Sequence, residues 1–202
     1  MELSQKQTVK IIAVILFLSA ISQPIYTALF KFAPEVERHF IWGIEALLFV
    51  LLAAFAGSAL VMAKRYTLGF SAIAFAATLN VVQIGIGLTQ FGPFRDAAKA
   101  SPDFEIAIPA IFGLSFFGYN AAKTLLGLAA MVFGMAKIGD GNKVLGGAAV
   151  LVGVVALFTN AMVMMFGLNG FMPRGLAGGS GVLATLLLAL CMFSVKSSQE
   201  QA

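Results

Sequence analysis

Six long apolar segments most constrain what this chain can fold into. They cover residues 11–30, 41–62, 66–88, 109–135, 144–168 and 181–195. A helix of roughly twenty apolar residues crosses the hydrocarbon core of a membrane, which is about 30 Å thick. The segments are continuous rather than alternating, which argues against the strands of a membrane β-barrel. The sequence therefore predicts an all-α polytopic bundle of about six transmembrane spans, forming a single integral membrane domain over residues 1–202.

The composition supports a membrane setting and excludes several kinds of chemistry. Apolar residues make up 60% of the 202 residues and charged residues only 11%, about half the charged fraction of a soluble domain. The net charge of +4 is interpreted as a set of topology signals rather than as a nucleic-acid surface. With one cysteine, Cys191, and one histidine, His39, the chain has no intrachain disulfide and no bis-histidine haem site. We expect no metal, no cofactor and no nucleic-acid partner.

The polar breaks predict where helices begin and turn. Ser101 followed by Pro102 has the pattern of an N-cap and a first helical residue, so the fourth helix is expected to begin near Pro102 and to bend at Pro109. The stretches 90–95 and 169–174 resemble each other, and both end in arginine. They are expected to be outer turns that form a lid or a docking rim, or that anchor the chain at the interface through phenylalanine.

Basic residues predict the orientation of the bundle, since they are enriched on the cytoplasmic side. With the N-terminus inside, seven of them lie at the cytoplasmic ends and five on the opposite side. The first set is Lys6, Lys10, Lys64, Arg65, Lys137, Lys143 and Lys196, and the second is Lys31, Arg38, Arg95, Lys99 and Arg174. This bias predicts that both termini are cytoplasmic.

The first apolar segment also resembles a signal peptide. Two lysines precede it, and Ala20 and Ser22 are small enough for the −3 and −1 positions of a cleavage site. We expect the segment to be retained as a signal-anchor helix. Because the tails are short and no organelle signal is visible, the expected location is a bacterial inner membrane.

Parts of the sequence suggest an internal duplication of a two-helix hairpin. The triplet Met-Ala-Lys occurs at 62–64 and again at 135–137. The stretch 80–93 matches 160–173 at five of fourteen positions with a constant offset of 80. The identities include Asn and Pro, which chance matching between apolar segments does not readily supply. Both hairpins would run in the same direction, so the repeat would be parallel rather than inverted.

Polar residues inside the spans form the main functional signal. At about 1.5 Å per residue, they lie about 20–28 Å above the nearest cytoplasmic basic residue. These residues are Gln23, Glu45, Asn80, Gln83, Asn120, Lys123 and Asn160. Five spans thus contribute amides or charges to one layer in the outer part of the membrane. We predict that this layer is a ligand-binding pocket.

Lys123 is the central residue of the predicted pocket. It shares a helix face with Asn120, Gly127 and Gly134, and small residues on that face favour close contact with another helix. A charge at this depth costs at least about 2.5 kcal/mol without a partner. Either Glu45 and the asparagines satisfy it, which makes a structural bridge, or water and an anionic ligand do, which makes a binding site.

Structural interpretations stay open for each of these residues. Glu45 lies near Trp42, where interfacial residues contact water. Asn80 and Asn160 are able to serve only as interhelical hydrogen-bonding groups. Lys123 is long enough to extend toward the outer headgroups.

Three functions are compatible with this pattern. The first is binding or transport of a small polar or anionic ligand, or of a lipid headgroup. The second is a non-catalytic structural or assembly subunit of a larger membrane complex. The third is a lipid-modifying enzyme, for which Glu45 and Lys123 are the only available acid–base pair. No nucleophile elbow or catalytic dyad is present, so we do not expect an enzyme. Expected partners are membrane lipids and either further copies of the chain or a larger complex.

Overall fold

The computed structural model describes residues 3–33, 35–167, 170 and 172–194. Within these ranges the chain forms helices and no strand. The elements are α1 (Gln5–Phe32), α2 (His39–Met62), α3 (Thr67–Ala100), the 3-10 turn η1 (Pro102–Phe104), α4 (Ala107–Gly139), α5 (Lys143–Phe166) and α6 (Arg174–Phe193). All six α-helices are long and apolar enough to cross a membrane. The prediction of an all-α, multi-pass bundle is confirmed to that extent.

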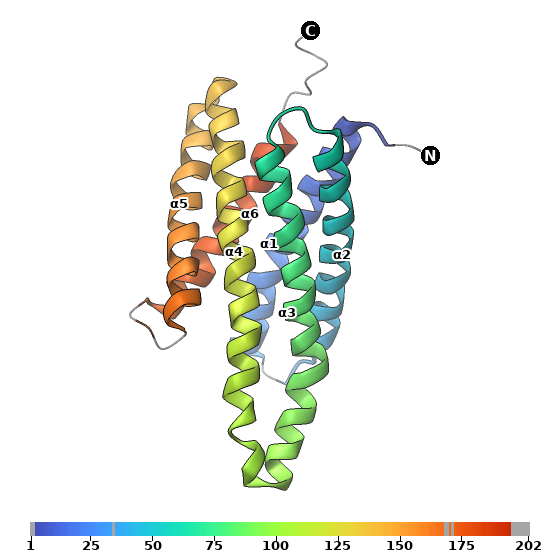
Figure 1. Cartoon of the computed structure of the whole chain (residues 1–202), viewed down its shortest axis with the longest axis vertical. Helices are drawn as coiled ribbons and strands as arrows, with labels where there is room; N and C mark the ends of the chain where they lie inside the picture. Colours follow the sequence, from blue (N-terminus) through green and yellow to red (C-terminus); the bar gives the residue numbers. More distant parts are fainter. Residues whose placement is uncertain (1–2, 34, 168–169, 171, 195–202) are drawn as a thin grey trace.

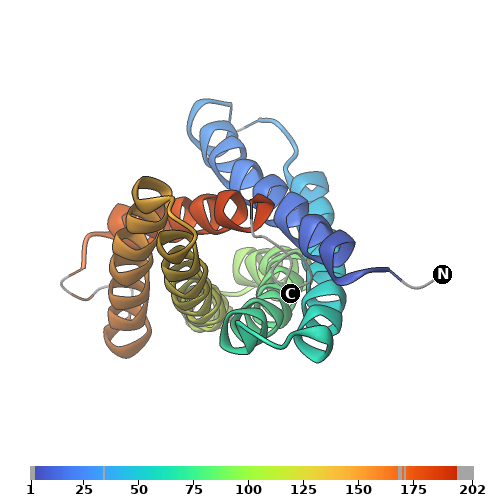
Figure 2. The ribbon, with the colours of Figure 1, turned by 90° about the horizontal axis from the view of Figure 1, so that it is seen from above.

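Five of the helices close into a ring, and α5 packs against its outside (Figure 2). Around the ring α1 packs on α2, α2 on α3, α3 on α4, α4 on α6, and α6 on α1. The remaining helix, α5, packs on both α4 and α6. Since α4 is not next to α1 or α2 in this order, a side-chain contact from α4 to either of them crosses the interior of the ring.

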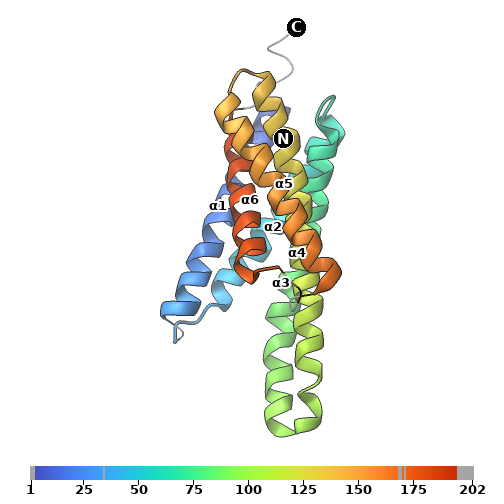
Figure 3. The same cartoon turned by 90° about the vertical axis from the view of Figure 1, so that its left-hand side faces the viewer.

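The ends of the helices alternate between the two ends of the bundle. The start of α1, the end of α6 and the turns α2–α3 and α4–α5 lie at one end, as Figure 1 shows. The α3–α4 connection lies at the other end of the bundle and projects beyond the other helices. The adjoining ends of α1 and α2 turn away from this connection (Figure 3). Consecutive α-helices therefore run in opposite directions along the bundle.

Glycines bring α4 and α5 into backbone contact. A Cβ atom added to Gly153 would lie 2.7 Å from the carbonyl oxygen of Gly127, and one added to Gly146 would lie 2.5 Å from that of Gly134. Both separations are shorter than any side chain tolerates, so only glycine permits this approach. The expectation that Gly127 and Gly134 allow close helix packing is confirmed.

The prediction of an outer turn at residues 90–95 is wrong, because α3 continues as a helix through Pro93 to Ala100. Its 34 residues correspond to about 51 Å, well beyond the span predicted to end at residue 88. Tertiary packing against α4 stabilises the extension. The ring of Phe91 lies 4.3 Å from that of Phe112, and the guanidinium group of Arg95 lies 5.5 Å from the Phe112 ring. Contacts between helices do not appear in a hydropathy pattern, so the sequence places the end of α3 too early.

Other predicted boundaries also shift. The α4 helix begins at Ala107 rather than near Pro102, which instead begins the 3-10 turn. Pro109 lies in the first turn of α4, where a missing N–H removes no intrahelical bond and requires no bend. The first helix begins at residue 5 rather than 11, and the last begins at residue 174 rather than 181. The predicted ends at 168 and 195, and part of the turn predicted at 169–174, lie outside the described residues.

Candidate functional site

Polar side chains from α1, α2 and α4 meet across the interior of the ring. The Tyr119 hydroxyl on α4 donates a hydrogen bond to Gln23 Oε1 on α1 at 3.4 Å. Beside Gln23, the Ser22 hydroxyl donates to Glu45 Oε1 on α2 at 2.5 Å. Lys123, one helical turn from Tyr119, has its Nζ 5.3 Å from the centre of the Tyr119 ring. We call these five residues the ring cluster.

Lys123 is enclosed by protein rather than directed to lipid. Its side chain is 1% exposed, and a Cβ added to Gly181 on α6 would lie 3.0 Å from its Cγ and Cδ atoms. The absence of a side chain at Gly181 therefore makes room for the lysine stem. Within the described ranges, Nζ forms the contact with the Tyr119 ring but no hydrogen bond or ion pair. The alternative in which this lysine extends to the headgroups does not fit its position.

Glu45 supplies the opposite charge but does not pair directly with Lys123. Its side chain is 5% exposed, so it is enclosed by protein rather than in contact with water as the interfacial interpretation requires. The contacts of Glu45 with Ser22 and of Lys123 with the Tyr119 ring place both groups in the ring cluster, yet no ion pair within 4.0 Å joins them among the described residues. A charge of each sign is therefore buried in one cluster with hydrogen-bonding capacity to spare.

Ser19 adds a further unpaired polar group on α1. It lies three and four residues before Ser22 and Gln23, so the three side chains share one helix face. Ser19 is 1% exposed, and its hydroxyl has no hydrogen-bond partner among the described residues. Leaving such a group unpaired costs about 1–3 kcal/mol. The face of α1 that carries the ring cluster is thus under-satisfied.

Two of the predicted site residues, Asn80 and Gln83, lie on α3 outside the ring cluster. Asn80 is 1% exposed and donates from Nδ2 to the carbonyl oxygen of Ala76 on its own helix at 3.0 Å. Gln83 donates from Nε2 to Ser115 Oγ on α4 at 3.2 Å. The first bond stays within α3 and the second joins α3 to α4, and neither residue forms a hydrogen bond to the ring cluster among the described residues.

The other two asparagines of the predicted layer are also buried and bonded to helix backbone. Asn120 donates to the carbonyl oxygen of Phe116 at 2.6 Å. Asn160 donates to Ala156 at 2.8 Å and to Ala177 on α6 at 3.1 Å, while its Oδ1 atom has no partner in the part of the chain that the structure describes. The predicted layer therefore divides. Gln23, Glu45 and Lys123 come together, Gln83 and Asn160 bond to neighbouring helices, and Asn80 and Asn120 bond within their own helices.

A row of aromatic side chains lies next to the ring cluster. Tyr26 stacks on Trp42 at 5.3 Å, Trp42 contacts Phe91 at 5.9 Å, and Phe91 contacts Phe112 as described above. The row crosses α1, α2, α3 and α4. Since Tyr26 lies three residues beyond Gln23 and Trp42 three residues before Glu45, the row is about 4.5 Å further toward the α3–α4 connection on both helices.

The connection between α1 and α2 is organised by local contacts beside this row. The backbone N–H of His39 donates to Glu37 Oε1 at 2.9 Å and lowers the pKa of that exposed carboxyl group. The guanidinium group of Arg38 lies 5.8 Å from the Tyr26 ring and 5.2 Å from the Phe30 ring. The connection thus borders the aromatic row from outside the spans.

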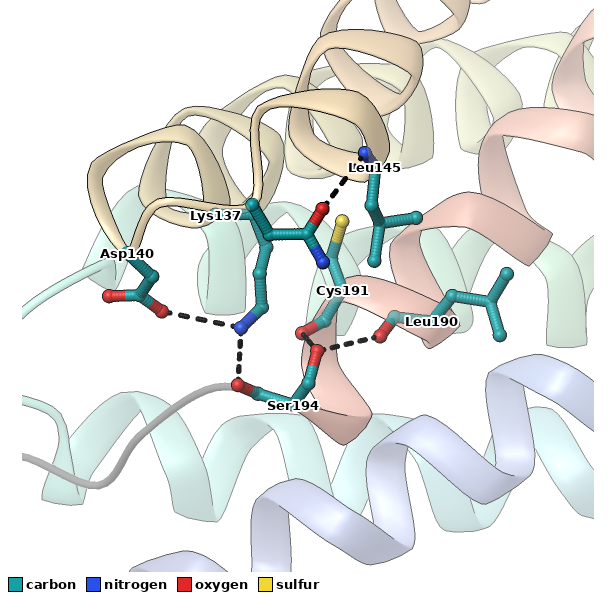
Figure 4. A network of polar contacts seen from close by, with 7 residues as sticks. Lys137, Asp140, Leu145, Leu190, Cys191 and Ser194 are labelled. Carbon is teal, nitrogen blue, oxygen red and sulfur yellow. Dashed lines mark hydrogen bonds and ion pairs between the residues drawn. The ribbon is translucent and has the colours of Figure 1, made fainter.

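A second buried lysine, Lys137, has a different role (Figure 4). Its side chain is 5% exposed, and its Nζ lies 3.3 Å from Asp140 Oδ2. It also donates to the carbonyl oxygen of Ser194 at the end of α6. From the sequence, Lys137 is interpreted only as one of the basic residues at the cytoplasmic surface that indicate the orientation of the bundle. In the structure it ties the end of α4 to the end of α6, because the last carbonyls of a helix lack intrahelical donors.

Sequence reasoning missed the residues that complete the ring cluster. Tyr119 lies four residues before Lys123, and that spacing alone would have placed it on the same face. Ser19 and Ser22 share a face with Gln23 for the same reason. The role of Gly181 depends on how α6 packs against α4, so no local pattern indicates it.

Fold and site together define a six-helix membrane-type bundle with a buried polar cluster of both charges. No family model, curated protein or solved structure matches the chain.

Proposed function

We propose that this chain is an integral membrane protein that binds or transports a small polar or anionic ligand, or a lipid headgroup, at the ring cluster. One observation carries the proposal: Lys123 is buried in the ring, and its Nζ contacts an aromatic face but no acceptor from the described chain. Lysine at the centre of a membrane helix costs about 2.5–3.5 kcal/mol on insertion scales. An acceptor on a ligand would offset that cost.

The residues divide into two roles under this proposal. Lys123 supplies the charge that attracts the ligand, and Glu45 supplies the counter-charge. Gln23 and Tyr119 orient the ligand through their hydrogen bond across the ring. Gln83 and Asn160 support the site by joining neighbouring helices, and Asn80 and Asn120 bond within their own helices beside it. We assign no chemical step to the cluster, so the protein is proposed to act without catalysis.

Replacing Lys123 with methionine tests the proposal, since methionine keeps the length of the side chain and removes the ammonium group. The purified protein is titrated with inorganic phosphate, phosphatidylglycerol and phosphatidylethanolamine, and binding is measured by native mass spectrometry. The wild type should bind at least one probe, and Lys123→Met should weaken that binding about tenfold or more. Lys143→Met, on an exposed lysine at the start of α5, is the matched control and should bind normally.

Two results would contradict the proposal. The first is a wild type that binds none of the three probes. The second is a Lys123→Met variant that binds them as well as the wild type does.

The proposed orientation has both termini in the cytoplasm of a bacterial cell, with the chain in the inner membrane. The seven-to-five distribution of basic residues supports it. Cysteine labelling tests it, because the native Cys191 is 0% exposed. A membrane-impermeant maleimide applied to whole cells should label Lys99→Cys and should leave Gly139→Cys unlabelled until the membrane is opened. The reverse pattern would overturn the orientation.

We also propose that α2–α3 and α4–α5 descend from one duplicated hairpin in parallel arrangement. Asn80 donates to Ala76 and Asn160 donates to Ala156, which is the same bond displaced by 80 residues. The two copies differ beyond this point, since α3 continues past Gly87 while α5 ends where Gly167 has a φ of 73°. A duplicated hairpin would thus have diverged at its outer end.

A second candidate function is a non-catalytic subunit of a larger membrane complex. The outward position of α5 favours it, because this helix exposes large apolar side chains such as Val144, Leu151 and Met165. The Lys123→Met variant separates the two candidates. In a structural subunit it would spare ligand handling and lower the yield of the assembled complex.

A further inference from the structure

We propose that the ligand of the ring cluster is a zwitterion, in which an anionic group binds Lys123 and a primary ammonium group binds Glu45. This inference rests on the proposed function and names the chemical class of its ligand. A phosphate ester of ethanolamine, free or as a lipid headgroup, has this chemistry.

The first argument is the arrangement of charge. Lys123 on α4 and Glu45 on α2 lie on helices that are not packed neighbours in the ring. Glu45 accepts from Ser22, Gln23 beside it accepts from Tyr119, and Lys123 contacts the Tyr119 ring. The two charged groups thus belong to one cluster, but no direct ion pair joins them among the described residues. Two opposite charges that are buried near each other but not joined are suited to a ligand that spans the distance between them. A ligand of one sign would meet one favourable and one repulsive group.

The second argument is the unused hydrogen-bonding capacity. The Lys123 ammonium has three donors and no acceptor from the described chain. Glu45 accepts from Ser22 at Oε1, and its other oxygen atom forms no hydrogen bond to the described residues. The site therefore requires acceptors at the lysine end and an N–H donor at the glutamate end. A quaternary ammonium group has no such donor, which is why a primary ammonium is specified.

The third argument is the position of the aromatic row. Trp42 lies three residues from Glu45, on the same face of α2, and stacks on Tyr26. Aromatic faces attract cations. The aromatic row thus borders the cluster on the side of Glu45, Ser22 and Gln23, which favours the cationic end of a ligand there. Lys123 lies one turn deeper than Tyr119 and receives the anionic end.

Lipid and soluble probes test this inference with the full-length protein in detergent. Phosphatidylethanolamine presents a phosphate and a primary ammonium, phosphatidylcholine a phosphate and a quaternary ammonium, and phosphatidylglycerol a phosphate alone. Native mass spectrometry should show phosphatidylethanolamine binding about tenfold more tightly than the other two. Glycerophosphoethanolamine, which lacks acyl chains, distinguishes the sources. If glycerophosphoethanolamine binds, the headgroup alone is recognised. If phosphatidylethanolamine binds and glycerophosphoethanolamine does not, the ligand is a membrane lipid.

Two variants separate this inference from the proposed function. Glu45→Gln should remove the preference for phosphatidylethanolamine over phosphatidylglycerol while binding of the latter persists. Glu45→Asp keeps the charge and should retain the preference. Equal wild-type binding of all three lipids, weakened by Lys123→Met, would overturn the zwitterion and leave the proposed function standing. This comparison of lipids uses the wild type and Lys123→Met, so it tests the inference even if the Glu45 variants do not fold. Absence of all binding would overturn both.

Discussion

Two buried lysines on α4 should respond in opposite ways to removal of their charge. Lys137 is bonded to Asp140 and to the last turn of α6, whereas Lys123 belongs to a cluster with unpaired groups. We compare Lys137→Met with the double variant Lys123→Met/Glu45→Gln. The double variant removes both buried charges at once, so that neither is left without its counter-charge.

The magnitudes follow from the contacts. Loss of a hydrogen bond from a charged group costs about 1.5–3 kcal/mol, and the partly exposed pair with Asp140 adds at most about 1 kcal/mol. Lys137→Met should therefore destabilise the fold by about 1.5–4 kcal/mol. Replacing a buried pair of charges by neutral groups of similar volume is typically neutral or stabilising by about 1–4 kcal/mol. The double variant should therefore be more stable than Lys137→Met by at least about 1.5 kcal/mol.

The measurement is the free energy of unfolding in mixed micelles, followed by far-ultraviolet circular dichroism as the denaturing detergent increases. The single variants complete a double-mutant cycle, which gives the coupling between Lys123 and Glu45 directly. If the double variant loses as much stability as Lys137→Met does, the reasoning is refuted. The ring cluster would then be a polar core that holds the helices together, and a ligand would not be needed to explain it.

Two glycine substitutions test the packing around the site. Gly153→Ala should destabilise the bundle by about 1–3 kcal/mol, because the new Cβ would meet the Gly127 backbone at 2.7 Å. Gly147→Ala, with nothing within 4 Å, is the control in α5, and equal effects would contradict the close approach. Gly87→Ala would place a Cβ 2.5 Å from the Trp42 ring. It should shift the emission of this tryptophan, the only one in the chain, and an unchanged spectrum would count against the aromatic row.

Burial of the polar residues was predictable from their positions within apolar helices. Asn80, Asn120, Lys123 and Asn160 are all 3% exposed or less, as a membrane setting requires of amides and charges that cannot meet water. Their partners were not predictable. An amide four residues after a helix carbonyl is able to bond to its own helix, as Asn120 does, or to a neighbour as well, as Asn160 does.

Lys137 illustrates the same limit for charges at helix ends. Its position in the last turn of a helix is typical of a residue at the membrane surface, and nothing nearby in sequence suggests otherwise. The carbonyl it binds belongs to Ser194, 57 residues away. Whether a terminal lysine contacts solvent or a second helix end depends on where that helix ends.

The succession of apolar and polar residues was enough to specify the number of helices, their membrane-spanning length and the burial of their polar side chains, because each of these follows from the transfer of local segments out of water. The contact between α1 and α6, by contrast, joins helices that are far apart in the chain. It closes the ring that brings together Gln23, Glu45, Tyr119 and Lys123. Those contacts arise from packing between whole helix faces, and only the assembled ring selects which faces meet.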